Sequence, residues 1–98
     1  MTSKSGYRIS LVGDVPSAIR KFASVAASLG KKKAYLEAWL TIESHLTTNP
    51  HQFGECRYTL LNGDLQCHIG AMAPVAVEFA VHEKTRTVMV LKAYLLGS

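Results

Sequence analysis

RYTLLNGDLQCHI, residues 57–69, is the stretch that decides the fold predicted from this sequence. Its centre, Asn62-Gly63, favours a two-residue type I′ turn between antiparallel strands. With the turn placed there, three pairs of residues lie opposite one another: Leu61 with Asp64, Tyr58 with Cys67, and Arg57 with His68. The stretch therefore predicts a β-hairpin.

Alternation along the hairpin sorts its side chains onto two faces. The first set is mostly apolar and is expected to face the core; it comprises Cys56, Tyr58, Leu60, Leu65, Cys67 and Ile69. The second set is expected to face solvent and comprises Arg57, Thr59, Leu61, Asp64, Gln66 and His68. One buried face is typical of an antiparallel sheet that packs on helices from one side.

Two more strands are expected after the hairpin. Residues 75–82 alternate, so that Phe79 points inward while Glu78 and His82 point outward. Residues 87–94 form the last strand, and a three-residue loop before Arg86 keeps Lys92 out of the core, where an unpaired charge is costly. The residues of this segment that then face outward are Arg86, Val88, Val90, Lys92 and Tyr94.

The residues before the hairpin predict one strand and two helices. Residues 7–12 alternate as a half-buried strand, and Asp14 is a suitable N-cap for a helix that ends at Gly30. A second helix over residues 31–48 ends before Asn49-Pro50. We therefore expect an α+β fold, in which an N-terminal strand precedes a two-helix hairpin packed on one face of an antiparallel sheet of about four strands.

Length and composition indicate a globular protein. The chain has 98 residues, of which 48% are hydrophobic and 18% are charged. We expect one domain over residues 1–98, with residues 1–6 flexible. No apolar run approaches the roughly 20 residues that cross a bilayer. No secretory signal is visible at the start, so the expected location is the cytoplasm.

Charge and motifs restrict the classes of function. The net charge of +4 favours polyanionic partners, such as nucleic acid or an acidic protein segment. The sequence contains no P-loop, GxGxxG or HExxH motif, and its four histidines lack the spacing of a metal site. No cofactor and no metal are therefore expected.

The outward face of the predicted sheet collects the candidate site residues. Cleavage of RNA by its own 2′-hydroxyl needs a base, an acid and cations beside the phosphate. We expect His68 and Glu78 to exchange the protons and Arg57 to hold the phosphate. Nucleic-acid binding is assigned to Arg8, Gln66, His82, Arg86, Lys92 and Tyr94. The alternative is that these polar side chains are simply solvated on the wet face of a small sheet.

The order of elements and several segments resemble the RelE/ParE family of bacterial type II toxins. The resemblance spans nearly the whole chain and rests on Asn49-Pro50, Gly54, and residues 57–65, 77–81 and 87–91. It implies a toxin that is neutralised by a cognate antitoxin, here a small acidic protein, and that acts either by cutting mRNA on the ribosome or on gyrase. The resemblance carries over four site candidates: Arg57, His68, Lys92 and Tyr94.

The sequence departs from this family at two places in the site. Residues 70–75 hold no arginine where many members have one, and the last strand ends KAYLL, residues 92–96, instead of with a His-Arg pair. Three functions therefore stay open. They are an endoribonuclease toxin acting in translation, a non-catalytic or degenerate module of the same fold that inhibits gyrase or binds an antitoxin, and a stand-alone nucleic-acid-binding domain.

Overall fold

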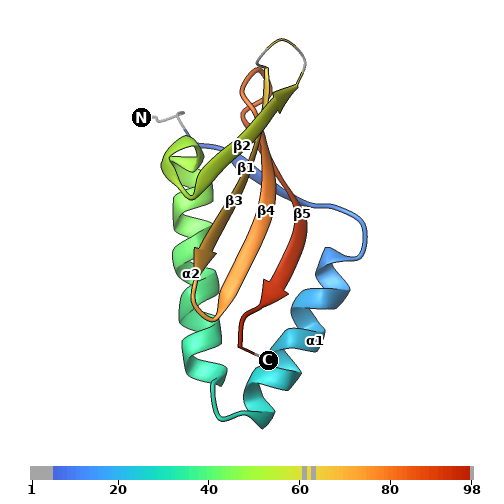
Figure 1. Ribbon diagram of the computed structural model, residues 1–98, viewed down its shortest axis with the longest axis vertical. Helices are drawn as coiled ribbons and strands as arrows, with labels where there is room; N and C mark the ends of the chain where they lie inside the picture. Colours follow the sequence, from blue (N-terminus) through green and yellow to red (C-terminus); the bar gives the residue numbers. More distant parts are fainter. Residues whose placement is uncertain (1–5, 61, 63, 98) are drawn as a thin grey trace.

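The computed structural model describes residues 6–60, 62 and 64–97. Its elements are β1 (Arg8–Leu11), α1 (Val15–Ser28), α2 (Lys32–Thr48), the short 3₁₀ helix η1 (Pro50–Gln52), β2 (Glu55–Leu60), β3 (Leu65–Met72), β4 (Val75–His82) and β5 (Thr87–Leu95). The strands form a sheet in the order β1-β5-β4-β3-β2 (Figure 1). Of the segment expected to be flexible, residues 1–6, all but Gly6 lie outside the described residues.

The α+β fold class is confirmed, with one correction to the sheet. Instead of about four antiparallel strands, five strands form a mixed sheet, because β1 joins the edge beside β5 in the parallel orientation. Helices α1 and α2 form the expected hairpin, with the chain reversing at Gly30, whose φ is +72°. Glycine fits this left-handed conformation because it has no Cβ.

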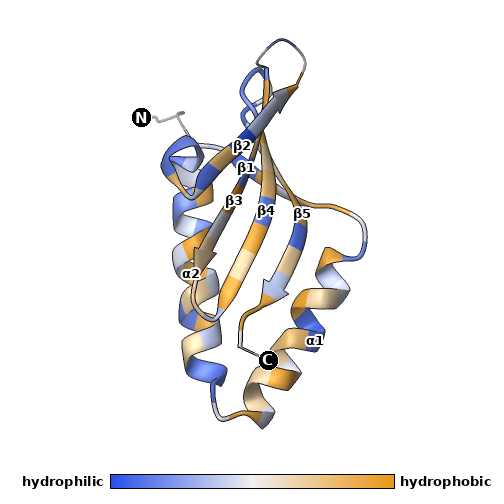
Figure 2. Ribbon diagram, in the orientation of Figure 1, coloured by the Kyte–Doolittle hydropathy of each residue, from blue (hydrophilic) through white to orange (hydrophobic). Residues whose placement is uncertain are grey.

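The hydrophobic core lies between the helix pair and one face of the sheet. Strand β4 contributes Val77, Phe79 and Val81, which are 0% exposed, and the strand is coloured as largely hydrophobic in Figure 2. Tyr35 of α2 is also buried, and its hydroxyl donates a hydrogen bond of 2.7 Å to the Ile19 carbonyl of α1. This bond satisfies the buried phenol and fixes α2 against α1.

The turn between β3 and β4 sets a register in which the side chains of β3 point to the opposite faces from those expected. Only Ala73 and Pro74 separate the two strands, and this two-residue turn pairs His68 with Phe79. Residues opposite each other share a face of the sheet, and Phe79 belongs to the core beneath the helices. The expected faces are therefore wrong: Gln66 and His68 point to the helix side, and Leu65, Cys67 and Ile69 point to the open side.

Strand β2 pairs with β3 through a bulge. Tyr58 lies opposite Cys67, as predicted. The predicted pair of Arg57 with His68 is wrong, because a bulge at Arg57 sets Cys56 opposite His68 instead. A bulge inserts one residue into a strand and re-aims the side chains next to it.

Two side chains of β2, Tyr58 and Leu60, follow their partners in β3 to the open side. Tyr58 and Leu60 are 56% and 48% exposed, so their expected burial is wrong. Leu61, which was predicted to pair with Asp64, lies outside the described residues.

A second bulge, in β5, keeps Lys92 out of the core. The loop between β4 and β5 has four residues, 83–86, and not the expected three. Phe79 then lies opposite Val90 but Glu78 lies opposite Lys92, so that Leu91 is the extra residue. The outward placement is thus confirmed for Lys92 and Tyr94 and wrong for Val88 and Val90, which are buried in the core.

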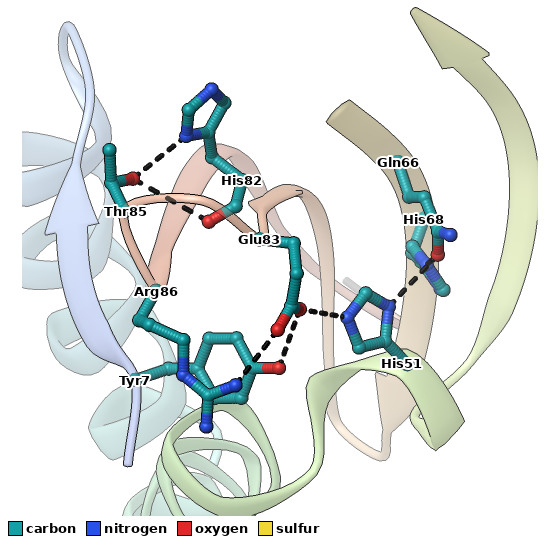
Figure 3. A network of polar contacts seen from close by, with 8 residues as sticks. All are labelled: Tyr7, His51, Gln66, His68, His82, Glu83, Thr85 and Arg86. Carbon is teal, nitrogen blue, oxygen red and sulfur yellow. Dashed lines mark hydrogen bonds and ion pairs between the residues drawn. The ribbon is translucent and has the colours of Figure 1, made fainter. Parts of the chain in front are cut away.

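A polar network closes the end of the sheet where η1, the β4–β5 loop and the start of β1 meet (Figure 3). The Glu83 carboxylate accepts hydrogen bonds from the Tyr7 hydroxyl at 2.7 Å, His51 Nε2 at 2.7 Å and Arg86 at 2.8 Å. The Arg86 guanidinium also lies over the Tyr7 ring, 4.2 Å from its centroid. The other ring nitrogen of His51, Nδ1, is 2.9 Å from Gln66 Oε1. Glu83 therefore joins three segments that are far apart in sequence.

These contacts make part of the stability depend on pH. The pKa of Glu83 is lowered to about 2, first by the hydrogen bond from His51, then by that from Tyr7, and further by Arg86. A carboxyl group whose pKa is lower in the folded than in the unfolded state stabilises the fold above its unfolded pKa. The contribution of Glu83 is therefore present above about pH 4.5 and is lost as the pH falls toward 2.

We expect Glu83→Gln to lower the free energy of unfolding at pH 7 by roughly 1 kcal/mol, a value that allows for the solvent screening of an exposed carboxylate. The variant should also lose less stability than the wild type between pH 4.5 and pH 2. Urea unfolding at a series of pH values measures both effects. Glu37→Gln, the same change at an exposed carboxylate of α2, serves as the control. A Glu83→Gln protein with the wild-type pH dependence would contradict this account.

Gly54 and Gly30 offer a matched pair for testing the close approach of β2 to β3. Both have φ of +72°, but a Cβ on Gly54 would lie 2.2 Å from the Ile69 carbonyl oxygen, whereas one on Gly30 would meet nothing within 4 Å. We expect Gly30→Ala to cost about 1 kcal/mol, the left-handed penalty alone. Gly54→Ala should cost about 3 kcal/mol or more, because the strand must also shift. Thermal unfolding compares the two, and equal losses would refute the close approach.

Candidate functional site

The candidate site lies on the face of the sheet that points away from the helices. Three residues cross the middle of this face in register: Ile69 of β3 lies opposite Glu78 of β4, which lies opposite Lys92 of β5. Helices α1 and α2 cover the other face, where Phe79 and Val88 are buried (Figure 1). The side chains around Glu78 are therefore open to a ligand.

A pocket of about 270 Å³ opens on this face. Its lining residues are Arg57, Tyr58, Cys67, His68, Ile69, Glu78, Phe79 and Leu91. The bulged residues of β2 and β5, Arg57 and Leu91, flank it on two sides. Bulges of this kind are over-represented next to active sites, because they re-aim a side chain without disturbing the rest of the strand.

Glu78 is the acidic group of the pocket. It is half-buried, and its Oε2 accepts a hydrogen bond from the Tyr94 hydroxyl. This bond raises the pKa of Tyr94, and burial and the charge of Glu78 raise it further, so the phenol stays protonated. Within the described ranges, Oε1 of Glu78 has no hydrogen-bond partner. The carboxylate therefore presents one oxygen that is free to accept a proton.

Two cations stand beside Glu78. Arg57 lines the pocket from β2, and Lys92 is the cross-strand neighbour of Glu78 in β5. Among the residues that the structure describes, neither forms an ion pair or a side-chain hydrogen bond. Unpaired cations on an exposed face are the groups that bind phosphate oxygens. The arrangement of a carboxylate between two free cations suits proton transfer next to a phosphodiester.

The structure separates the residues that the sequence assigned to this site into two groups. Those on the open face are Arg57, Glu78, Lys92 and Tyr94 around the pocket, with His82 and Arg8 farther along the same face. His82 is turned toward the β4–β5 loop, where its Nδ1 is 2.8 Å from Thr85 Oγ1. Those in the polar network at the end of the sheet are Gln66, His68 and Arg86.

His68 is the main correction to the predicted site. It is 3% exposed, and its ring stacks on that of Phe79 with centroids 5.1 Å apart. Its Nε2 lies 3.3 Å from Gln66 Oε1, on the face of the sheet that the helices cover (Figure 3). Burial lowers the pKa of His68, and nearby His51 lowers it further, so the ring is held in its neutral form. The expected exposure of His68 on the pocket face is wrong.

Five pocket residues were not foreseen from the sequence. Tyr58, Cys67, Ile69 and Phe79 were assigned to the core, and Leu91 is placed in the pocket by a bulge that the sequence does not mark. The faces of Tyr58, Cys67 and Ile69 follow from the two-residue turn at Ala73-Pro74, which sets the register of β3 on β4 and hence the faces of β2.

Two features are absent from the described residues. No helix among them is long and apolar enough to cross a membrane. Within the same ranges, no group of three or more His, Cys, Asp or Glu side chains is placed to hold a metal ion.

Comparisons with known proteins identify the fold through structure alone. No protein-family model matches the sequence. No curated protein matches it either. The structure is similar to a chain in the crystal structure of the archaeal RelE-RelB complex from Pyrococcus horikoshii OT3, with a TM-score of 0.64 and 19% identity over 93% of this chain and 96% of that chain. The fold expected from the resemblance in sequence is thereby confirmed, and the chain has a RelE-like fold.

Proposed function

We propose that the protein is the toxin component of a toxin–antitoxin pair and that it inhibits translation by cutting ribosome-associated mRNA on its open sheet face. The observation that carries the proposal is the free oxygen of Glu78 between two unpaired cations, Arg57 and Lys92, at the edge of a pocket. The RelE-like fold supports the toxin role. The same fold and the cytoplasmic location expected from the sequence agree with a target in translation.

The proposed chemistry is attack by an RNA 2′-hydroxyl on the adjacent phosphorus. Glu78 Oε1 takes the 2′-hydroxyl proton, while Arg57 and Lys92 stabilise the negative charge that builds up on the phosphate oxygens. The P–O2′ bond forms and the P–O5′ bond breaks, which yields a 2′,3′-cyclic phosphate and a 5′-hydroxyl. Tyr94 gives its proton to the leaving 5′-oxygen and recovers one from Glu78 through the hydrogen bond that already joins them.

The remaining sequence-assigned residues take supporting roles in this proposal. Arg8 and His82 extend the open face toward the β1 edge and would contact phosphates outside the pocket. Three side chains of the polar network at the end of the sheet hold β3 and the β4–β5 loop in place: Gln66, His68 and Arg86. They are not assigned contacts with RNA.

The partner that fits this chain is an acidic antitoxin. The net charge of +4 favours association with an acidic protein segment. The similar archaeal structure is described as a RelE-RelB complex, which supports a protein partner for the same fold.

A second candidate function is a non-catalytic binding module of this fold, directed at gyrase or at an antitoxin alone. The observation in its favour is that the Tyr94 hydroxyl occupies one oxygen of Glu78. In addition, the His68 ring is 3% exposed and stacks on Phe79. In this second candidate function, the polar residues of the open face bind the partner protein and do not catalyse a reaction.

The decisive comparison is cell-free translation with primer extension on the message, using the wild type and Glu78→Gln. Loss of the general base should reduce the rate of ribosome-dependent cleavage by about 10²- to 10⁴-fold. Glu37→Gln, which removes an exposed carboxylate from α2, should cut at the wild-type rate.

Two outcomes would contradict the proposed reaction. Cleavage by Glu78→Gln at the wild-type rate would show that Glu78 is not the general base. An intact message and unchanged translation with the wild type would point to the binding module, which a DNA supercoiling assay with gyrase would then test.

A further inference from the structure

Helix α2 carries an exposed stripe of side chains that neither the core nor the site beside Glu78 uses. Leu36 and Leu40 are 47% and 66% exposed, and Leu40 is the most exposed of the large hydrophobic side chains that the structure describes. Lys33 lies one turn before Leu36, Glu43 lies one turn after Leu40, and both are exposed. Spacings of three and four residues place these four side chains on one side of the helix. Together they form the α2 stripe.

The two charged residues of the α2 stripe have no partner within the described part of the chain. Neither Lys33 nor Glu43 forms an ion pair or a side-chain hydrogen bond there. They are ten residues apart in sequence, about 15 Å along the helix axis, so they cannot reach each other. Lys33 also lies in the first turn of α2, which holds no acidic residue and where a cation opposes the helix dipole. Both charges are therefore available to a second molecule.

The α2 stripe borders an apolar groove of about 600 Å³. Leu36, Leu40 and Glu43 form part of its wall, and Ile9 and Leu11 of β1 line it as well. Glu43 is the one charged residue among the described residues of this lining. Exposed apolar side chains gathered around a hollow mark an interaction surface. A surface that covers this groove therefore has to be apolar, with a cation placed to meet Glu43.

The α2 stripe itself has this composition when a second copy is turned end to end. The stripe consists of a charge, a leucine, a leucine and the opposite charge, spaced by three, four and three residues in either direction. If two α2 helices lie antiparallel with their Ala38 residues at the same level, Lys33 of one copy lies opposite Glu43 of the other, and Leu36 lies opposite Leu40. Two-fold symmetry then forms every contact twice, as in an isologous interface.

We infer that the protein forms a symmetric homodimer in which the α2 stripes of two copies pack antiparallel and cover the groove of each copy. The leucines supply the apolar contact. The two Lys33–Glu43 pairs fix the direction and the register, as flanking charges do in coiled coils. Each pair also places a carboxylate beside a lysine that opposes the dipole of its own helix.

The dimer is independent of the proposed function. Helix α2 covers the face of the sheet opposite the pocket beside Glu78 (Figure 1). Both pockets of the dimer therefore stay open, whichever function they have.

The test is sedimentation equilibrium of the full-length protein at concentrations from about 1 μM to about 1 mM, a range that covers weak and moderate dimer affinities. We expect the average mass of the wild type to rise from that of one chain to that of two. Lys33→Glu and Glu43→Lys each place like charges opposite one another, so each should raise the dimer dissociation constant at least about tenfold. Mixed in equal amounts, the two variants should associate about as tightly as the wild type, because every charge then faces its opposite.

Lys21→Glu is the matched control, because it makes the same change of charge at an exposed lysine of α1 that does not line the groove. Its dissociation constant should stay within about twofold of the wild-type value. Circular dichroism checks that each variant is folded.

Three results would overturn the inference. A wild type that is monomeric at every concentration would exclude the homodimer and leave the groove to a helix of another protein. A dimer that neither single charge reversal weakens would not be held by the α2 stripe. Single variants that fail to associate when mixed would exclude the antiparallel pairing of Lys33 with Glu43.

Discussion

The burial of every second residue of β4 against the helices is the constraint on which the site depends. Val77, Phe79 and Val81 must lie beneath α1 and α2, because they supply the most deeply buried apolar surface of the sheet. Side chains alternate along a strand, so Glu78 has to point to the open face. The two-residue turn at Ala73-Pro74 sets the register of β3 on β4, in which His68 lies opposite Phe79 and therefore on the core side.

Two bulges interrupt this strict alternation of side chains and change which residues face the open side. Without the extra residue Leu91, burial of Val90 in β5 would also bury Lys92, and an unpaired ammonium in the core is too costly. The bulge at Arg57 in β2 similarly places a cation at the pocket edge while Tyr58 keeps its partner Cys67. The irregularities that complicate the sheet are thus the features that give the open face its cations.

The sequence was sufficient for the fold class and for half of the candidate site. Hydrophobic periodicity and the breaks at Gly30 and Asn49-Pro50 predict the helix hairpin, and the alternation of β4 predicts that Glu78 faces outward. The prediction was wrong for Gln66 and His68, because β3 has its more apolar residues on the open side, against the usual pattern. A pattern of hydrophobicity identifies a strand, but its register on the next strand decides which way each residue points.

Glu78 is the residue of the open face that packing explains least. Its neighbours on the same face of β4, Ala76 and Ala80, are small and apolar, and they show that packing at this level of the strand does not require a charge. Partial burial of a carboxylate costs free energy, which the hydrogen bond from Tyr94 offsets. A carboxylate that packing does not require, in the middle of β4 and beside Arg57, Lys92 and a pocket, is what the proposed chemistry needs.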